Sequence, residues 1–161
     1  MNRRTIIALC AIATFGLATS WFGQPAHAAD PTSAGTWELN IAKSKSTDPM
    51  PKSIVRTYEP TGITEKLTGT IVNAEGKTIP VAFTATLDGK DYPSTSTPGA
   101  DTLALTRVDA LTISYVNKLA GKEVASGTRV LSQDGKTMTF MQKGTNAAGK
   151  PFESTMVYDR R

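Results

Sequence analysis

The chain has 161 residues, with 18 basic and 14 acidic side chains, one histidine and one cysteine. Cys10 and His27 both lie in the first 28 residues, so a chain that loses this segment has neither a thiol nor an imidazole. That composition excludes histidine- or cysteine-dependent hydrolysis, zinc or haem bound through histidine, and thiolate redox chemistry. The sequence also has no P-loop and no dinucleotide-binding fingerprint. We therefore expect no enzyme activity, no metal and no cofactor.

The N-terminal segment has the parts of an export signal. Arg3 and Arg4 precede an apolar run from Ile6 to Phe22, and Ala26-His27-Ala28 forms a small-x-small cleavage site. A membrane anchor is the alternative interpretation of the apolar run, but the cleavage site favours removal. We expect residues 1–28 to be a signal peptide for either the general secretory or the twin-arginine route, which leaves no stable membrane anchor.

Removal of this segment leaves residues 29–161, which we expect to form a single periplasmic or secreted domain. Loss of Arg3 and Arg4 reduces the lysine and arginine total from 18 to 16 against 14 acidic residues, so the net charge falls to +2. No basic run with interleaved aromatic residues is present. We therefore expect no nucleic-acid partner.

The first predicted strand of the domain begins at Gly35-Thr36-Trp37. After it comes Ala42 to Lys52, an irregular stretch with prolines, and a second irregular stretch, Asp91 to Ala100, is rich in Pro, Ser, Thr and Gly. Both are expected to be loops. No long window after the signal peptide shows helical periodicity, so the domain is expected to be all-β.

Glycine-lysine dipeptides mark the turns between strands. Each follows Glu, Asp or Ala, and glycine supplies the positive φ that a tight hairpin turn requires. The longest interval between them, 32 residues, must hold one further hairpin, and Asp109-Ala110 is its expected turn. The five dipeptides are Gly76-Lys77, Gly89-Lys90, Gly121-Lys122, Gly135-Lys136 and Gly149-Lys150.

Between the turns, apolar residues alternate with period two. The alternation is clearest from Ile79 to Leu87, where apolar side chains share one face and threonines share the other. One face of each strand is therefore expected to point to a core. The other inward sets are expected to be Ile63, Leu67 and Ile71; Leu103 and Leu105; Leu111, Ile113 and Tyr115; Val124 and Val130; and Phe152, Met156 and Tyr158.

These elements predict an antiparallel up-and-down β-barrel of about eight to ten strands. An open sheet of this many strands would leave long edges unprotected, which favours closure. A two-sheet sandwich is the alternative.

Both ends of the domain resemble the calycins. Gly35-Thr36-Trp37 matches the glycine-x-tryptophan signature of lipocalins and fatty-acid-binding proteins, and Ser154 to Arg160 resembles the last strand of the fatty-acid-binding proteins. With GTWELN, AKSK, DGKDYP and KGTN, the domain is similar to exported bacterial proteins described as lipocalin-like. The resemblance implies that Trp37 plugs the closed end of a barrel, with Arg160 or Arg129 stacked on it.

Two differences from the fatty-acid-binding proteins limit what carries over. Met156 stands where that family has an arginine that holds a carboxylate, so only Tyr158 of that pair is shared. The short Ala42 to Lys52 segment also replaces the family's helical lid.

Three arginines lie within expected strands: Arg56, Arg107 and Arg129. Nearly every lysine, in contrast, lies in a turn or loop. A guanidinium enclosed by a barrel needs an anionic partner, and a ligand carboxylate or phosphate could serve as one. Alternatively, these arginines lie at a rim, reach solvent, or pair with acidic side chains of the domain. The acidic candidates are Glu38, Glu59 and Asp109.

The candidate ligand-binding residues combine these arginines with aromatic and methionine side chains on inward faces. Met138 or Met141, together with Phe140, would line a hollow barrel and would be packing in a filled one. Glu65 could act as a general acid only if burial raised its pKa, and no second carboxylate accompanies it. The candidates are Arg56, Tyr58, Arg107, Tyr115, Arg129, Met156 and Tyr158.

The leading functional hypothesis is an exported lipocalin-like module that binds a small apolar or amphipathic molecule, which the arginines allow to be anionic. The alternative is a protein-interaction or inhibitor module, a filled barrel acting through Ala42 to Lys52 and Asp91 to Ala100. A carboxylate-dependent enzyme built on Glu65 is a third hypothesis.

Overall fold

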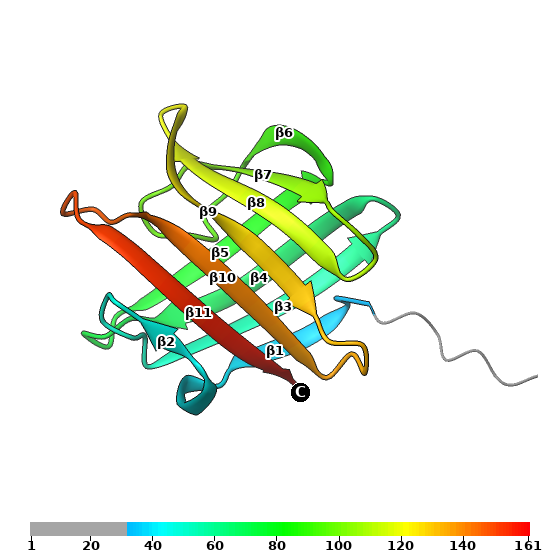
Figure 1. The fold of residues 1–161 in the computed structure, drawn as a ribbon, viewed down its shortest axis with the longest axis horizontal. Helices are drawn as coiled ribbons and strands as arrows, with labels where there is room; N and C mark the ends of the chain where they lie inside the picture. Colours follow the sequence, from blue (N-terminus) through cyan, green and yellow to red (C-terminus); the bar gives the residue numbers. More distant parts are fainter. Residues whose placement is uncertain (1–31) are drawn as a thin grey trace, which may run out of the picture.

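The computed structural model describes residues 32–161, which form one antiparallel sheet curved into a barrel (Figure 1). The expected signal peptide, residues 1–28, lies outside the described residues. No helix in the described part is long and apolar enough to cross a membrane. The elements are β1 (Gly35–Leu39), a 3-10 helix η1 (Ile41–Lys43), β2 (Lys45–Ser46), β3 (Ser53–Thr61), β4 (Thr64–Val72), β5 (Thr78–Thr86), β6 (Asp88–Pro93), β7 (Thr102–Arg107), β8 (Thr112–Leu119), β9 (Lys122–Leu131), β10 (Thr137–Thr145) and β11 (Pro151–Arg160).

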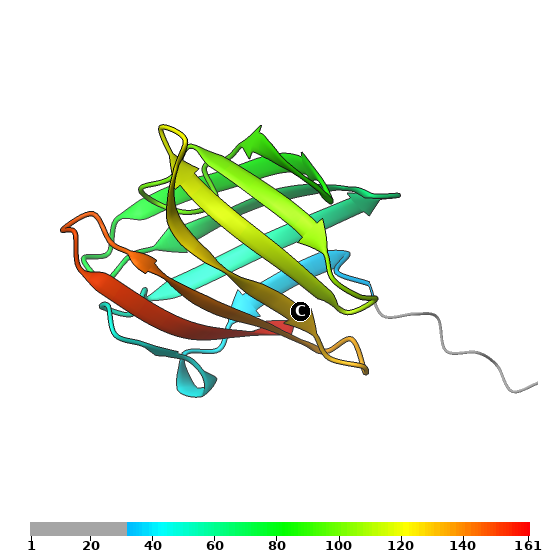
Figure 2. The same ribbon diagram turned by 45° about the horizontal axis from the view of Figure 1, so that its top comes forward.

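The strand order is β5-β4-β3-β1-β11-β10-β9-β8-β7-β6, with β2 paired to β11 beside this path. The two outer strands of the path meet through a bridge between Phe83 and Ser94, and the Thr95 N–H donates to the Ala82 carbonyl at 2.9 Å. Figure 2 shows the two halves of the sheet curving around a common interior. The predicted up-and-down barrel is therefore confirmed.

The described residues form eleven strands, slightly more than the expected eight to ten, because two stretches expected to be loops contain strand. The Ala42 to Lys52 stretch contains β2, and the Asp91 to Ala100 stretch begins within β6. The rest of the second stretch does not stand out from the rim, because the side chains of Ser94 and Ser96 are buried. This segment turns inward and covers part of the barrel opening.

Four of the five predicted glycine-lysine turns are confirmed, those at Gly76, Gly121, Gly135 and Gly149. The prediction at Gly89-Lys90 is wrong: this dipeptide lies within β6 at a register shift, and β5 and β6 stand at the two ends of the strand order. All five glycines of the glycine-lysine dipeptides have positive φ, between 66° and 90°. In the β7–β8 turn, the Asp109 carboxylate accepts the N–H groups of Leu111 and Thr112, both at 2.8 Å. A further turn at Gly62, with φ of 59°, joins β3 to β4, and the dipeptide pattern does not predict it.

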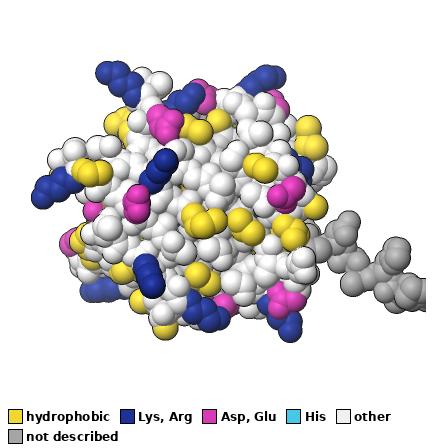
Figure 3. All heavy atoms as spheres, in the orientation of Figure 1, with side chains coloured by type: hydrophobic (Ala, Val, Ile, Leu, Met, Phe, Trp, Pro, Cys, Tyr) yellow, Lys and Arg dark blue, Asp and Glu magenta, His cyan; other side chains and the backbone are white. Residues whose placement is uncertain are grey.

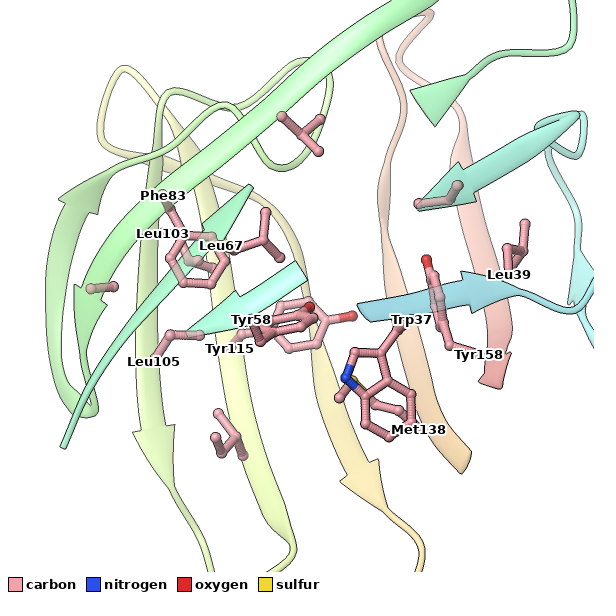
Figure 4. Packing of buried hydrophobic residues seen from close by; sticks show 14 of the residues in the cluster. Trp37, Leu39, Tyr58, Leu67, Phe83, Leu103, Leu105, Tyr115, Met138 and Tyr158 are labelled. Carbon is pink, nitrogen blue, oxygen red and sulfur yellow. The ribbon is translucent and has the colours of Figure 1, made fainter. Parts of the chain in front are cut away.

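The core follows the predicted inward faces on most strands (Figure 4). Val81, Phe83 and Ala85 of β5 are buried as expected. Met138, not Met141, is the inward methionine of β10, since Met141 is 47% exposed. Ile63, expected inward, is 63% exposed because it lies in the β3–β4 turn.

The inward face of β9 differs from the prediction. Val124 and Val130 are only partly buried, and the inward face instead carries Ala125, Arg129 and Leu131. Two faces of β9 are similarly apolar in sequence, so the alternation does not decide between them. An acidic partner inside the barrel permits Arg129 to point inward, as described below.

Trp37 closes one end of the barrel and is fully buried. The Arg160 guanidinium lies 4.3 Å from the centre of its ring, and the indole N–H donates to the Ser33 carbonyl at 2.8 Å. Arg160 also donates to the carbonyls of Thr32 and Ala34. The expected stacking of Arg160 on Trp37 is confirmed, and it holds residues 32–34 across this end.

Gly127 of β9 lies where two neighbouring strands leave no room for a side chain. A Cβ atom there would lie 2.0 Å from the Met141 carbonyl oxygen and 2.9 Å from the Tyr115 Oη. We expect Gly127→Ala to lower the free energy of unfolding by about 3 kcal/mol, measured by urea denaturation. Ser126→Ala on the same strand should change it by less than about 0.5 kcal/mol. Equal stability of the two variants would contradict this account of the β9 backbone.

Candidate functional site

A cavity of about 320 Å³ opens at the barrel end opposite Trp37. It lies between the connection from β2 to β3, the turn from β4 to β5 and the segment after β6. We call this cavity the mouth. Its apolar wall is formed by Ile54, Ile71, Phe152 and Met156.

A smaller cavity of about 40 Å³, which we call the inner chamber, lies deeper in the barrel. Arg56, Ser96, Thr97, Phe140 and Gln142 line both the mouth and the inner chamber. The two cavities are therefore parts of one passage, and Arg56 lies where they meet.

Arg56 projects from β3 into this passage. Its Nη2 donates to the Ser96 carbonyl at 3.2 Å, and its guanidinium lies 5.4 Å from the centre of the Phe140 ring and 5.7 Å from that of Tyr158. The Nε atom is buried and has no hydrogen-bond partner among the described residues. None of the ion pairs in the described part of the chain includes Arg56. This cation is held by one carbonyl and two aromatic rings.

Tyrosine side chains surround the same space (Figure 4). Tyr58 and Tyr115 line the inner chamber, Tyr158 lines the mouth, and the Tyr115 hydroxyl donates to Gln142 Oε1 at 3.2 Å. Burial raises the pKa of both Tyr115 and Tyr158 above the ordinary value of tyrosine, against the opposing charge of Arg56. Their phenols therefore stay protonated at neutral pH and can donate hydrogen bonds.

Arg129 has a different environment from Arg56. Its Nη1 and Nη2 donate to the two carboxylate oxygens of Glu65 at 2.6 and 2.8 Å, and both residues are buried. The Ser33 hydroxyl also donates to Glu65, at 2.9 Å, and the guanidinium lies 4.8 Å from the centre of the Tyr58 ring. Although burial opposes the charge, the Glu65 carboxylate keeps the pKa of Arg129 raised. Of the alternatives given for the arginines, pairing with an acidic side chain applies to Arg129, but the partner is Glu65 and not Glu38, Glu59 or Asp109.

This ion pair gives Glu65 a structural role. Both of its oxygens accept hydrogen bonds, and its charge is balanced by Arg129. In residues 32–161 no group of three or more acidic, histidine or cysteine side chains could hold a metal ion. The hydrogen bonds to Glu65 thus all come from Ser33 and Arg129, which are residues of the domain itself.

Arg107 does not join the passage. It is exposed at the end of β7, beside a hollow of about 330 Å³ at the Trp37 end of the barrel. The structure thus brings together Arg56, Tyr58, Tyr115, Arg129, Met156 and Tyr158 around one passage and places Arg107 at the opposite end. Arg107 follows the alternation of Leu103 and Leu105, but it is the last residue of β7 and lies beyond the buried part of the strand.

Several polar residues of the passage are absent from the candidates drawn from the sequence, among them Asn117, Gln142 and Ser96. Asn117 continues the inward alternation of Ile113 and Tyr115, and Gln142 continues that of Met138 and Phe140, so the period-two pattern could have identified both. Ser96 belongs to an irregular segment, and no local pattern shows that it turns inward.

A larger depression of about 820 Å³ lies on the outer face of β8 to β11, beside β2. Short hydroxyl side chains such as Ser114, Ser126 and Thr155 supply much of its lining. Figure 3 shows this outer face as mostly uncharged, with scattered hydrophobic side chains. It offers no buried charge, so the passage is the better candidate site despite its smaller volume.

No protein-family model matches this chain, and no curated protein matches it. Among solved structures, the chain is similar to a redesigned β-barrel, mFAP1, bound to DFHBI. The sequence identity is 15%, the match covers 80% of this chain and 94% of that chain, and the TM-score is 0.41. A likeness this weak carries no argument about function, and membership of a lipocalin-like family stays a prediction.

Removing the acidic partner should expose the cost of the buried Arg129 charge. We expect Glu65→Gln to lower the free energy of unfolding by about 3–5 kcal/mol in urea denaturation. Replacing both partners, Glu65→Leu with Arg129→Met, should restore much of this loss because no unpaired charge remains. Glu59→Gln is the control, because Glu59 pairs with Lys66 at the surface, and its effect should stay below about 1 kcal/mol. A Glu65→Gln protein as stable as the control would refute the structural role of the pair.

Proposed function

We propose that the barrel holds a small amphipathic anion, with the anionic group beside Arg56 and the apolar part in the mouth. The observation that carries this proposal is the position of Arg56, a cation that lines both cavities and forms no ion pair among the described residues. The one acidic side chain that lines the mouth, Asp48, accepts a hydrogen bond from Asn146 instead. A guanidinium removed from water is costly unless an anion and hydrogen bonds compensate. A bound carboxylate, phosphate or sulfonate would supply both.

The surroundings of Arg56 suit the polar end of such a ligand. Tyr58 lines the inner chamber and Tyr158 lines the mouth, so their phenols can donate hydrogen bonds into the passage, and the buried Nε–H of Arg56 has no partner among the described residues. The phenols can donate as well as accept, and the guanidinium only donates and is positively charged, so an acceptor-rich headgroup is favoured over an amine.

The mouth suits the apolar end. Ile54, Ile71, Phe152 and Met156 provide a wall of aliphatic, aromatic and thioether surface. A volume of about 320 Å³ lies at the small end of the range for ligand sites. The proposed ligand therefore has a medium-length chain or one ring system, and methionine adapts to either.

We also propose that the protein is exported and acts in the periplasm or outside the cell. The support is the sequence of residues 1–28, with its arginine pair, apolar run and Ala26-His27-Ala28. The intact mass of the protein purified from an exporting bacterial host should correspond to a chain that begins at Ala29. A mass that includes the first 28 residues would contradict cleavage at this site.

Arg56→Gln tests the proposed ligand site. We expect the mature wild-type protein to bind decanoate in isothermal titration calorimetry. The affinity of the variant should be lower by a factor of about ten or more, because a charge-assisted hydrogen bond is lost. Binding of decanol, which has no charge, should change little.

Arg107→Gln is the matched control, since it removes the same charge from the opposite end of the barrel. It should leave decanoate affinity unchanged. Equal loss in both variants would indicate a general charge effect and contradict the site. Absence of decanoate binding to the wild type, with no retained molecule in native mass spectra, would favour the protein-interaction module instead.

A further inference from the structure

The inner chamber contains a second unpaired polar group, which an anion on Arg56 does not explain. Asn117 of β8 is only 1% exposed, and its Oδ1 has no hydrogen-bond partner among the described residues. It lines the same chamber as Arg56. Its strand lies five positions from β3 in the ten-strand path, so the two side chains face the chamber from opposite walls.

The neighbours of Asn117 do not satisfy its Oδ1 atom. The residues beside it in the sheet are Leu103 of β7 and Ala125 of β9, and both are buried and apolar. A buried polar group without a partner costs free energy, and a leucine of similar shape would avoid that cost. The described residues therefore supply no hydrogen-bond partner for the Asn117 Oδ1 atom.

A hydroxyl is the group that fits this position. An amide donates through its nitrogen and accepts through its oxygen, and a hydroxyl also does both, so the two match in either orientation of the amide. The chamber volume of about 40 Å³ admits only a small substituent. An ammonium group is disfavoured because Arg56 lines the same chamber.

We propose, building on the function above, that the ligand is a hydroxy acid: its carboxylate lies beside Arg56, and a hydroxyl near the carboxylate pairs with Asn117 across the inner chamber. The carbon chain extends into the mouth. The segment around Ser96, which lines both cavities, covers the polar end. A site built for a hydroxyl rejects an analogue that lacks it, because the amide is then left unpaired.

The test compares decanoic, 2-hydroxydecanoic and 3-hydroxydecanoic acid by titration calorimetry on the mature wild-type protein and on Asn117→Leu. We expect the wild type to bind at least one hydroxy acid about tenfold more tightly than decanoic acid. In Asn117→Leu this preference should disappear while decanoic acid binding is kept. The melting temperature of Asn117→Leu should also rise, because an unpaired amide has been removed.

The outcomes separate this inference from the proposed function. Equal wild-type affinity for all three acids would overturn the hydroxy-acid inference, with water as the partner of Asn117, and would leave the anion site in place. A preference that persists in Asn117→Leu would also overturn it. Failure of the wild type to bind any of the acids would overturn both proposals. The wild-type comparison needs no variant, so it decides the question even if Asn117→Leu does not fold.

Discussion

The closed interior of the barrel is the constraint on which the other features depend. Side chains that point inward share a small space, and each charge among them needs a partner. Arg129 has one, because the Glu65 carboxylate accepts hydrogen bonds from both of its terminal nitrogens. Arg56 has a carbonyl and two aromatic rings. The contrast divides the interior into a neutral part that supports the fold and a cationic part that faces the mouth.

Much of this fold follows from local features of the sequence. Glycine at Gly76 or Gly135 determines where the chain can reverse, and period two determines which side chains of β5 point inward. The face of β9 does not follow in this way. Its orientation depends on Glu65, which is 64 residues from Arg129, and no local pattern reports that pairing.

Part of the candidate site could likewise be predicted from the sequence. Arg56, Tyr58 and Tyr158 were recognisable as inward residues of strands, and the structure brings them to one passage. Arg107 satisfied the same alternation, yet alternation gives the face of a side chain and not its height along the barrel axis. Ser96 required knowledge of how an irregular segment folds back, which depends on the bridge between Phe83 and Ser94.

The place of β1 in the sheet determines the order in which the molecule can form. β1 pairs on one side with β3 and on the other with β11, so Trp37 lies opposite Arg160. Contacts so distant in sequence cannot form until synthesis is almost complete, and they slow folding. The first strand of a nascent chain therefore lacks one neighbour until the last strand has left the ribosome. The hairpins from β3 to β5 can pair before then, so closure of the sheet at β1 is the last pairing that synthesis permits.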